Sequence, residues 1–204
     1  MKKGIIALIG MIVALVLIIV AFVGPWYVMS SGTSDSTMSL TSTTSKSGSY
    51  SATVSHADSK KAMEAMSLKT GLYDVFNYAF YLTIFVLIVA ILALIFMLGH
   101  VFNFGKPKMM KNLATIFGII TFVLALVTVL YFMVALPSEI NKLNTLGATN
   151  IGFWYSATIG GVAGSLGPGY AWYLMLVAAI IALIASVAML LKKSAPEVVA
   201  QPPQ

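Results

Sequence analysis

The sequence predicts a membrane protein built as an all-α bundle of four transmembrane helices, with a small extracellular antiparallel β-sheet formed by its two outer loops. Three observations support this fold class. The chain of 204 residues is 59% hydrophobic and 9% charged, with a mean hydropathy of +0.96. It contains four apolar runs of about 20 residues, the length that a helix needs to cross roughly 30 Å of hydrocarbon. The two longer polar segments between these runs carry strand-like alternation.

The first apolar run, Gly4–Gly24, follows the basic start Lys2-Lys3. A cleaved signal peptide is the alternative, but this run is longer than a typical signal core and no Ala-x-Ala type site follows it. Gly24-Pro25 then ends the helix. We therefore interpret it as a retained first span.

The predicted organisation alternates spans with polar segments. In chain order it comprises 1–25 (first helix with a short cytoplasmic N-terminus), 26–74 (first extracellular loop), 75–99 (second helix), 100–112 (cytoplasmic loop), 113–136 (third helix), 137–169 (second extracellular loop), 170–191 (fourth helix) and 192–204 (disordered cytoplasmic tail).

The lysines predict the orientation in the cell membrane. The formal net charge is +6, and all twelve basic residues are Lys. Most flank the ends of the spans in ones and twos, at 2–3, 106–111 and 192–193, so both termini are expected to be cytoplasmic. Without Arg to make bidentate contacts with phosphates or bases, no nucleic-acid partner is expected.

The four spans contain no Asp, Glu, Lys, Arg or His between their ends. Charged groups in mid-membrane are the usual sign of a proton relay or an ion path, so their absence argues against a transporter or a pump. Small residues at helical spacing instead predict close helix packing within the bundle. These are Gly10, Ala14, Ala114, Gly118, Ala178, Ala182 and Ser186. Chance spacing and a dimer interface are the alternatives.

The first outer loop predicts a hairpin followed by a short helix. Strands are expected at Thr37–Thr44 and Ser49–Ser55, with Ser47-Gly48 between them. A disordered, O-glycosylated linker is the alternative for this Ser/Thr-rich stretch. Beyond it, Asp58 or Ser59 is expected to cap a helix that runs to about Lys69.

The second outer loop carries the clearest strand, Ile151–Ile159, with a return over Val162–Leu166 after the turn Gly160-Gly161. Because an isolated hairpin is only marginally stable, both loops are expected to share one sheet. Aromatic side chains are expected to supply its packing and interaction surface. The candidates are Trp26, Tyr50, Phe153, Trp154 and Tyr155.

This order of parts resembles the claudin-like tetraspan superfamily. The shared features are a first span that ends near a Trp (Trp26), a first loop with strands and then a short helix, and a strand-bearing second loop. The Gly-Leu-Trp and the two Cys of the family's first-loop signature are missing. The resemblance implies a tetraspan fold, an extracellular helix at 59–69 and a role in lateral or cell–cell association.

The residues that could carry chemistry do not form a recognisable site. The absence of Cys excludes disulfides and thiolate metal sites. His56 and His100 are predicted on opposite sides of the membrane, so they cannot share a metal. No catalytic, metal or cofactor-binding residues are therefore expected, and no small-molecule substrate.

The sequence thus predicts a non-enzymatic structural or interaction protein of the cell membrane. Its expected partners are the lipid bilayer and other membrane proteins or copies of itself. An accessory subunit of a larger membrane enzyme or transport complex is the alternative, and a channel formed between copies is a third reading.

Overall fold

The computed structural model describes residues 2–67, 70–143, 151–159 and 161–190; the tail predicted at 192–204 lies outside them. The elements are, in chain order, α1 (Lys2–Val23), β1 (Tyr27–Ser31), β2 (Ser34–Met38), β3 (Ser42–Ser47), β4 (Tyr50–Ser55), α2 (His56–Ala65), α3 (Leu72–Val101), α4 (Pro107–Leu143), β5 (Tyr155–Ile159), β6 (Val162–Pro168) and α5 (Tyr170–Leu190).

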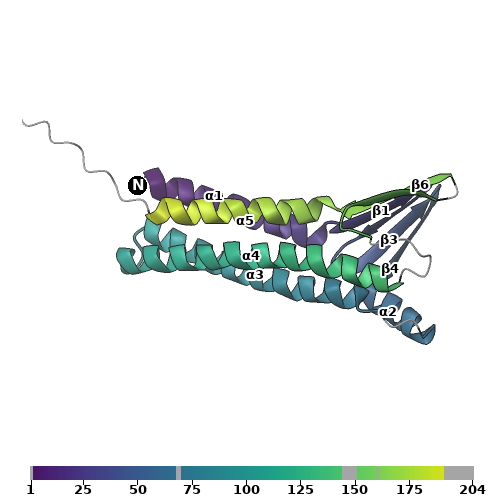
Figure 1. Cartoon of the computed structure of the whole chain (residues 1–204). Coiled ribbons are helices and arrows are strands. Elements are labelled where there is room, and N and C mark those ends of the chain that lie inside the picture. The colour runs from purple at the N-terminus through teal and green to yellow at the C-terminus, as the bar shows by residue number, and fades with distance from the viewer. Residues whose placement is uncertain (1, 68–69, 144–150, 160, 191–204) are drawn as a thin grey trace, which may run out of the picture.

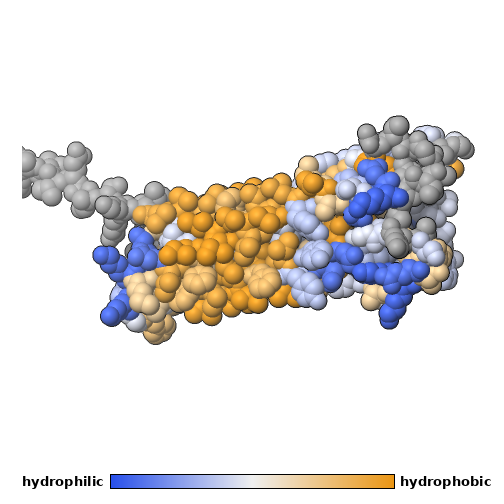
Figure 2. Space-filling view, turned by 60° about the horizontal axis from the view of Figure 1, so that its bottom comes forward, coloured by the Kyte–Doolittle hydropathy of each residue, from blue (hydrophilic) through white to orange (hydrophobic). Residues whose placement is uncertain are grey.

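Four of these helices, α1, α3, α4 and α5, lie along one another as a bundle (Figure 1). Each packs against two others: α1 against α3 and α5, and α4 against α3 and α5. Within the described residues these four are long and apolar enough to cross a membrane. Figure 2 shows a continuous hydrophobic belt over the bundle on the face in view, with hydrophilic residues at both ends.

The sheet is mounted on one end of this bundle (Figure 1). Its six strands are antiparallel throughout, in the order β4-β3-β2-β1-β6-β5. Four strands come from the segment between α1 and α3, and two come from the segment between α4 and α5. The pairing of β1 with β6, where the two segments meet, therefore joins residues about 140 positions apart, since Tyr27 is paired with Pro168.

The first predicted strand, Thr37–Thr44, is wrong in its bounds. The chain turns at Ser39–Thr41, because the Ser39 hydroxyl accepts hydrogen bonds from the backbone N–H of Thr41 and of Ser42. This turn directs Leu40 into the core, where 2% of it is exposed. The strand is thereby divided into β2 and β3.

The sequence interpretation missed the hairpin of β1 and β2. These strands are rich in Ser, which has little intrinsic β-propensity. Gly32 makes their two-residue turn in the left-handed region, at φ +57°. Pairing on both sides, with β3 and with β6, stabilises a segment whose own sequence favours strand only weakly.

Helix α2 runs from His56 to Ala65, so it begins before both predicted caps, Asp58 and Ser59. Its N-cap is Ser55, whose hydroxyl accepts a hydrogen bond from the Asp58 backbone N–H at 3.1 Å. In the other segment, the strand predicted at Ile151–Ile159 starts only at Tyr155. Phe153 lies instead under the sheet, 5% exposed, where it packs against the bundle.

Helix α4 extends beyond the predicted third span at both ends. It continues through Pro137 to Leu143. The last turns find partners outside the helix: Glu139 accepts a hydrogen bond from the Gly71 N–H, and Asn141 exchanges two hydrogen bonds with the backbone of Ile151. These bonds tie α4 to the start of α3 and to the segment that leads into β5.

Candidate interaction surface on the six-stranded sheet

The sheet is joined to the bundle by backbone hydrogen bonds between two chain crossings. At the first crossing α1 continues through Pro25-Trp26 into β1, and at the second β6 continues through Gly169 into α5. The Gly169 N–H donates to the Trp26 carbonyl at 2.9 Å, and the Ala171 N–H donates to the Pro25 carbonyl at 3.1 Å. These bonds leave the sheet little freedom to tilt independently of α1 and α5.

Aromatic side chains fill the space between the sheet and the helices. We call them the junction cluster: Trp26, Phe76, Phe132, Phe153 and Trp172, each at most 5% exposed. Phe132 is central, with ring centroids 5.2 Å from Trp26, 5.1 Å from Phe76 and 6.1 Å from Phe153. Such edge-on pairs contribute about 0.5–1.5 kcal/mol each beyond area burial.

Both indole N–H groups of the junction cluster have hydrogen-bond partners. The indole N–H of Trp26 donates to the Ala21 carbonyl at 2.8 Å, and that of Trp172 donates to the Val129 carbonyl at 3.1 Å. The neighbouring Tyr27 hydroxyl donates to the Phe153 carbonyl, and burial raises the pKa of Tyr27 to about 12. The junction therefore holds neutral, hydrogen-bonded groups.

The register of the strands separates the sheet into two faces. Residues directly paired across strands point to the same side. One side, which we call the hydroxyl face, is dominated by Ser and Thr. It comprises Val28, Ser30, Asp35, Thr37, Ser42, Thr44, Lys46, Ser51, Thr53, Ser55, Ser156, Thr158, Ala163, Ser165 and Gly167.

Cross-strand hydrogen bonds order the side chains of the hydroxyl face. The hydroxyls of Thr44 and Thr53 lie 2.9 Å apart, and Ser30 donates to the Asp35 carboxylate at 2.5 Å. The face therefore presents a regular array of hydroxyls with one acidic and one basic side chain. Such a surface is suited to hydrogen bonding with a partner and carries little net charge.

The opposite side, the apolar face, carries larger side chains near the bundle. Tyr27, Met29, Met38, Tyr155 and Leu166 share this side. A hollow of about 510 Å³ lies here against β1, β2, β5 and β6. At the tips of β1, β2 and β3 this face carries Ser31, Ser34 and Ser47, whereas the tips of β4 and β6 carry Tyr50 and Val162.

The two edge strands of the sheet are β4 and β5. In β4, Tyr50 is 71% exposed and Val54 is 45% exposed. In β5, Ser156 and Thr158 are exposed. Neither strand contains a charged residue or a proline, the usual protections of an edge against pairing with another chain.

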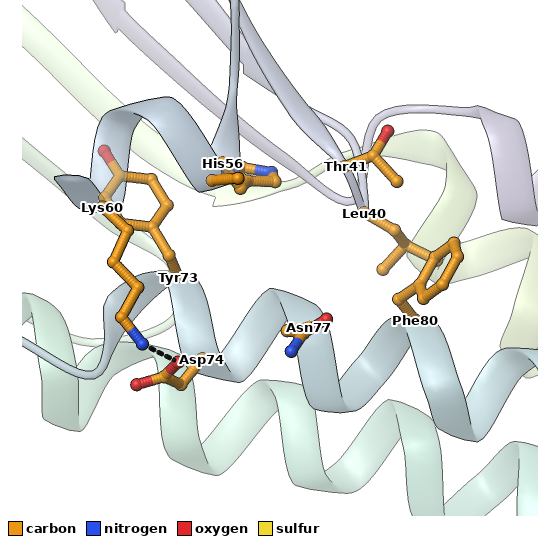
Figure 3. Close-up of a pocket in the computed structure, with 9 residues that line it drawn as sticks. Leu40, Thr41, His56, Lys60, Tyr73, Asp74, Asn77 and Phe80 are labelled. Carbon is orange, nitrogen blue, oxygen red and sulfur yellow. Dashed lines mark hydrogen bonds and ion pairs between the residues drawn. The ribbon is translucent and has the colours of Figure 1, made fainter.

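A cavity of about 300 Å³ lies where α2 covers the first turns of α3 (Figure 3). His56 lines it from above, and Tyr73, Asp74 and Asn77 line it from α3. The Lys60 ammonium bonds the Asp74 carboxylate at 2.7 Å beside the cavity. This bond and the charge of Asp74 raise the pKa of Lys60, so the Lys60 ammonium keeps its charge beside the cavity.

His56 is 93% buried beside this cavity, since 7% of it is exposed. Its ring stacks on Phe76 at 4.6 Å, and Nε2 lies 2.8 Å from the Ser39 carbonyl oxygen. Because a carbonyl only accepts, Nε2 carries a proton. Burial lowers the pKa of His56, against a smaller opposing effect of the Ser39 hydrogen bond. The ring is thus a neutral packing group that ties α2 to the Ser39 turn.

The structure separates the predicted aromatic residues. Trp26 and Phe153 lie together in the junction cluster. Trp154 is 53% exposed at the rim, with its indole N–H donating to the Tyr173 hydroxyl at 3.3 Å. Tyr155 is half-buried on the apolar face, and Tyr50 lies at the start of edge strand β4, far along the strands from the junction.

The predicted small residues lie inside the bundle. A Cβ added at Gly118 of α4 would overlap the Ser186 hydroxyl of α5, and one added at Gly10 of α1 would lie 3.3 Å from the Ala185 Cβ of α5. The other predicted small residues are fully buried: Ala14, Ala114, Ala178, Ala182 and Ser186. Their close approach holds α5 against α1 and α4.

Sequence reasoning missed Phe76, Phe132, Trp172 and His56 as residues that position the sheet. Phe76 and Phe132 sit in apolar runs where nothing distinguishes them from lipid-facing neighbours. Trp172 reads in the sequence as an aromatic anchor at the outer membrane interface, whereas the structure buries it, 5% exposed. His56 of α2 packs against Phe76 near the start of α3, and His100 lies in the last turn of α3, so the two histidines are at opposite ends of that helix. Among the described residues no three His, Asp or Glu side chains are grouped to hold a metal ion.

No protein-family model and no curated protein sequence matches this chain.

Proposed function

We propose that this chain is a non-enzymatic multi-pass protein of the cell membrane that presents its six-stranded sheet on the extracellular side as an interaction module. The observation that carries the proposal is the junction: two segments far apart in sequence form one sheet, and that sheet is fixed to the end of the bundle. Holding a small sheet rigidly while leaving its hydroxyl face and edge strands exposed favours a surface for recognition.

The extracellular side is proposed from the distribution of lysines. The connection between α3 and α4 carries Lys106, and the first turns of α4 carry Lys108 and Lys111. This region lies at the end of the bundle opposite the sheet, as do the start of α1 and the end of α5 (Figure 1). Lys-rich short loops favour the cytoplasmic side. The sheet then faces outward.

The interior of the bundle supports a scaffold role over a transport role. The described interior residues form two hydrophobic clusters, one running from the junction to mid-bundle and one at the far end. The buried polar side chains inside the bundle are those of Thr and Ser. The hydroxyls of Thr83, Thr121 and Ser186 each donate to the carbonyl four residues earlier in their own helix. Such groups leave no charge for an ion path.

The layout shared with claudin-like tetraspan proteins supports an associative role as well. The alternative of an accessory subunit has no specific contact in its favour. The small-residue faces of Gly10, Gly118 and Ala182 are used within this chain, so a larger complex would have to bind the bundle through other surfaces.

The orientation can be tested with single cysteines, because the native chain has none. Lys46→Cys on the hydroxyl face and Lys108→Cys at the start of α4 form a matched pair of exposed positions. In intact cells, a membrane-impermeant maleimide should label only Lys46→Cys, and permeabilisation should expose both. Labelling of Lys108→Cys alone would refute the proposed orientation.

The associative role can be tested by crosslinking in native membranes, followed by mass spectrometry. Wild type should yield crosslinked species that involve the sheet. A matched variant with Thr44→Lys and Thr53→Lys on the hydroxyl face retains the lipid-facing surface of the helices, so species lost in it depend on the sheet. Monomers alone in both proteins would refute the proposed function.

A further inference from the structure

We propose that the partner of this sheet is a second copy of the same chain, which adds edge to edge, β4 of one copy against β5 of the next. This inference rests on the proposed function and specifies its partner. It follows from the even number of strands, from the outward backbone groups of the two edges, which have no hydrogen-bond partner among the described residues, and from the orientation that a shared membrane imposes.

Strand parity makes the two edges compatible. The sheet has six antiparallel strands, so β4 and β5 run in opposite directions. Copies in one membrane share the same orientation along the membrane normal. When such copies stand side by side, β4 of one and β5 of its neighbour are therefore antiparallel, the more stable arrangement for adjacent strands. A sheet with an odd number of strands would bring two parallel strands together.

The outward hydrogen-bonding groups of β4 follow from its hairpin. A two-residue turn, Gly48-Ser49, separates the paired residues Ser47 and Tyr50. The pair that closes such a turn exchanges both of its hydrogen bonds, and bonded pairs then recur at every second residue. The His56 N–H, which donates to the Thr41 carbonyl at 2.9 Å, continues this alternation.

Tyr50, Ala52 and Val54 consequently direct their backbone groups towards β3. The N–H and C=O groups of Ser51 and Thr53 point away from the sheet. This edge therefore offers two residues with outward donors and acceptors, spaced two apart.

The outward groups of β5 have the same spacing. Ile159 is paired with Val162 across two residues, so Tyr155, Ala157 and Ile159 bond to β6. The N–H and C=O groups of Ser156 and Thr158 point outward.

The faces of neighbouring copies also match. The register connects Ser51 through Lys46, Asp35, Ser30 and Ser165 to Ser156, all on the hydroxyl face. Pairing the outward residues of β4 with those of β5 therefore places hydroxyl face beside hydroxyl face. The neighbouring copy can therefore pair while its helices keep the same orientation in the membrane. The hydroxyl face and the apolar face each continue from one copy to the next.

The bundles leave room for this arrangement. Six strands at about 4.8 Å give a repeat of about 29 Å between copies. A bundle two helices wide, with axes 8–10 Å apart and helices of 10–12 Å diameter, is about 20 Å across. Adjacent bundles therefore do not collide. Because the contact joins two different edges it is head-to-tail, so it extends as an open row, which strand twist would curve.

Proline substitutions at outward positions can block one edge at a time. Proline removes the outward N–H of Thr53 or Ser156 but spares each strand's bonds to its own neighbour. The matched controls are Thr53→Ala and Ser156→Ala, which retain the N–H. Buried-Trp fluorescence of Trp26 and Trp172 reports whether each variant keeps its fold.

The measurement is subunit counting by stepwise photobleaching of labelled protein in proteoliposomes. Wild type and both alanine variants should give a broad distribution of multimers, and each proline variant alone should give monomers. Mixing Thr53→Pro with Ser156→Pro should restore dimers and nothing larger, because each mixed pair has one intact β4 edge and one intact β5 edge.

Three results would overturn the inference. Multimers of wild-type size in a folded Thr53→Pro sample would show that β4 is not used. Multimers with Ser156→Pro but not with Thr53→Pro would indicate a β4–β4 contact. Monomeric wild type that crosslinks only to a different protein in native membranes would exclude self-association, and that result would leave the proposed interaction function standing.

Discussion

Gly169→Ala adds only one methyl group, but we expect it to weaken the attachment of the sheet to the bundle strongly. A Cβ at Gly169 would overlap the Pro25 carbonyl oxygen and lie 2.7 Å from the Pro25 carbonyl carbon. Both are backbone atoms, so the two chain crossings must separate. Two hydrogen bonds at the crossings would weaken, at about 1 kcal/mol each, and overpacking adds about 1–3 kcal/mol. The expected loss is therefore about 3–5 kcal/mol in the free energy of unfolding.

The assay is reversible SDS unfolding in mixed micelles, followed by Trp fluorescence, since Trp26 and Trp172 are buried at the junction. Gly164→Ala in the same β6–α5 region is the matched control. Its added Cβ would lie 3.5 Å from the nearest atom, the Ser30 carbonyl oxygen, so a change within about 1 kcal/mol is expected. Equal unfolding free energies for the two variants would refute the close-approach argument.

Three further predictions concern the bundle and its contact with α2. Gly118→Val should lower the free energy of unfolding by about 1–3 kcal/mol, because its side chain would displace Ser186 from the α4–α5 contact; the SDS assay measures this, and an unchanged midpoint would contradict it. Trp172→Phe should cost about 1–3 kcal/mol, because it removes the indole hydrogen bond to the Val129 carbonyl and leaves a gap in the junction cluster; a near-neutral effect would show that the indole contributes nothing. His56 should make stability depend on pH. Its pKa is lowered in the fold, so the unfolded chain binds the proton more readily. Stability is then full above about pH 6.5 and falls below it by at most about 1.4 kcal/mol per pH unit. The pH dependence of unfolding in wild type and His56→Gln tests this, and equal slopes would contradict it.

Two local signals of the sequence predicted most of the bundle. Apolar runs of membrane length gave the four helices, and Gly10 and Gly118 marked faces where helices approach closely. Helix ends were less predictable. Pro137 indicates an end to α4, yet the helix continues because Glu139 and Asn141 find partners in other segments. Those partners lie 10 to 68 positions away, and no local pattern shows them.

The sheet was predictable only in part, for the same reason. The hairpin at Ser42–Ser55 follows from alternation and a glycine turn. The hairpin of β1 and β2 does not, because its Ser-rich strands depend on pairing with β3 and β6. In the sequence His56 likewise looks like an ordinary external histidine. In the structure the Ser39 turn and Phe76 enclose it.

What the sequence by itself determined is the presence of four helices long and apolar enough to cross a membrane, with no charged residue in their middle and no Cys in the chain, because hydropathy and residue type are properties of each segment alone. Only the tertiary structure decided that the sheet has six strands and that its edge strands run in opposite directions. Those features depend on β1 pairing with β6, a contact between residues near opposite ends of the chain. At the junction the Gly169 N–H bonds the Trp26 carbonyl, and Trp26 and Trp172 pack in one buried cluster; these contacts join distant parts of the chain, so no local pattern of the sequence shows them.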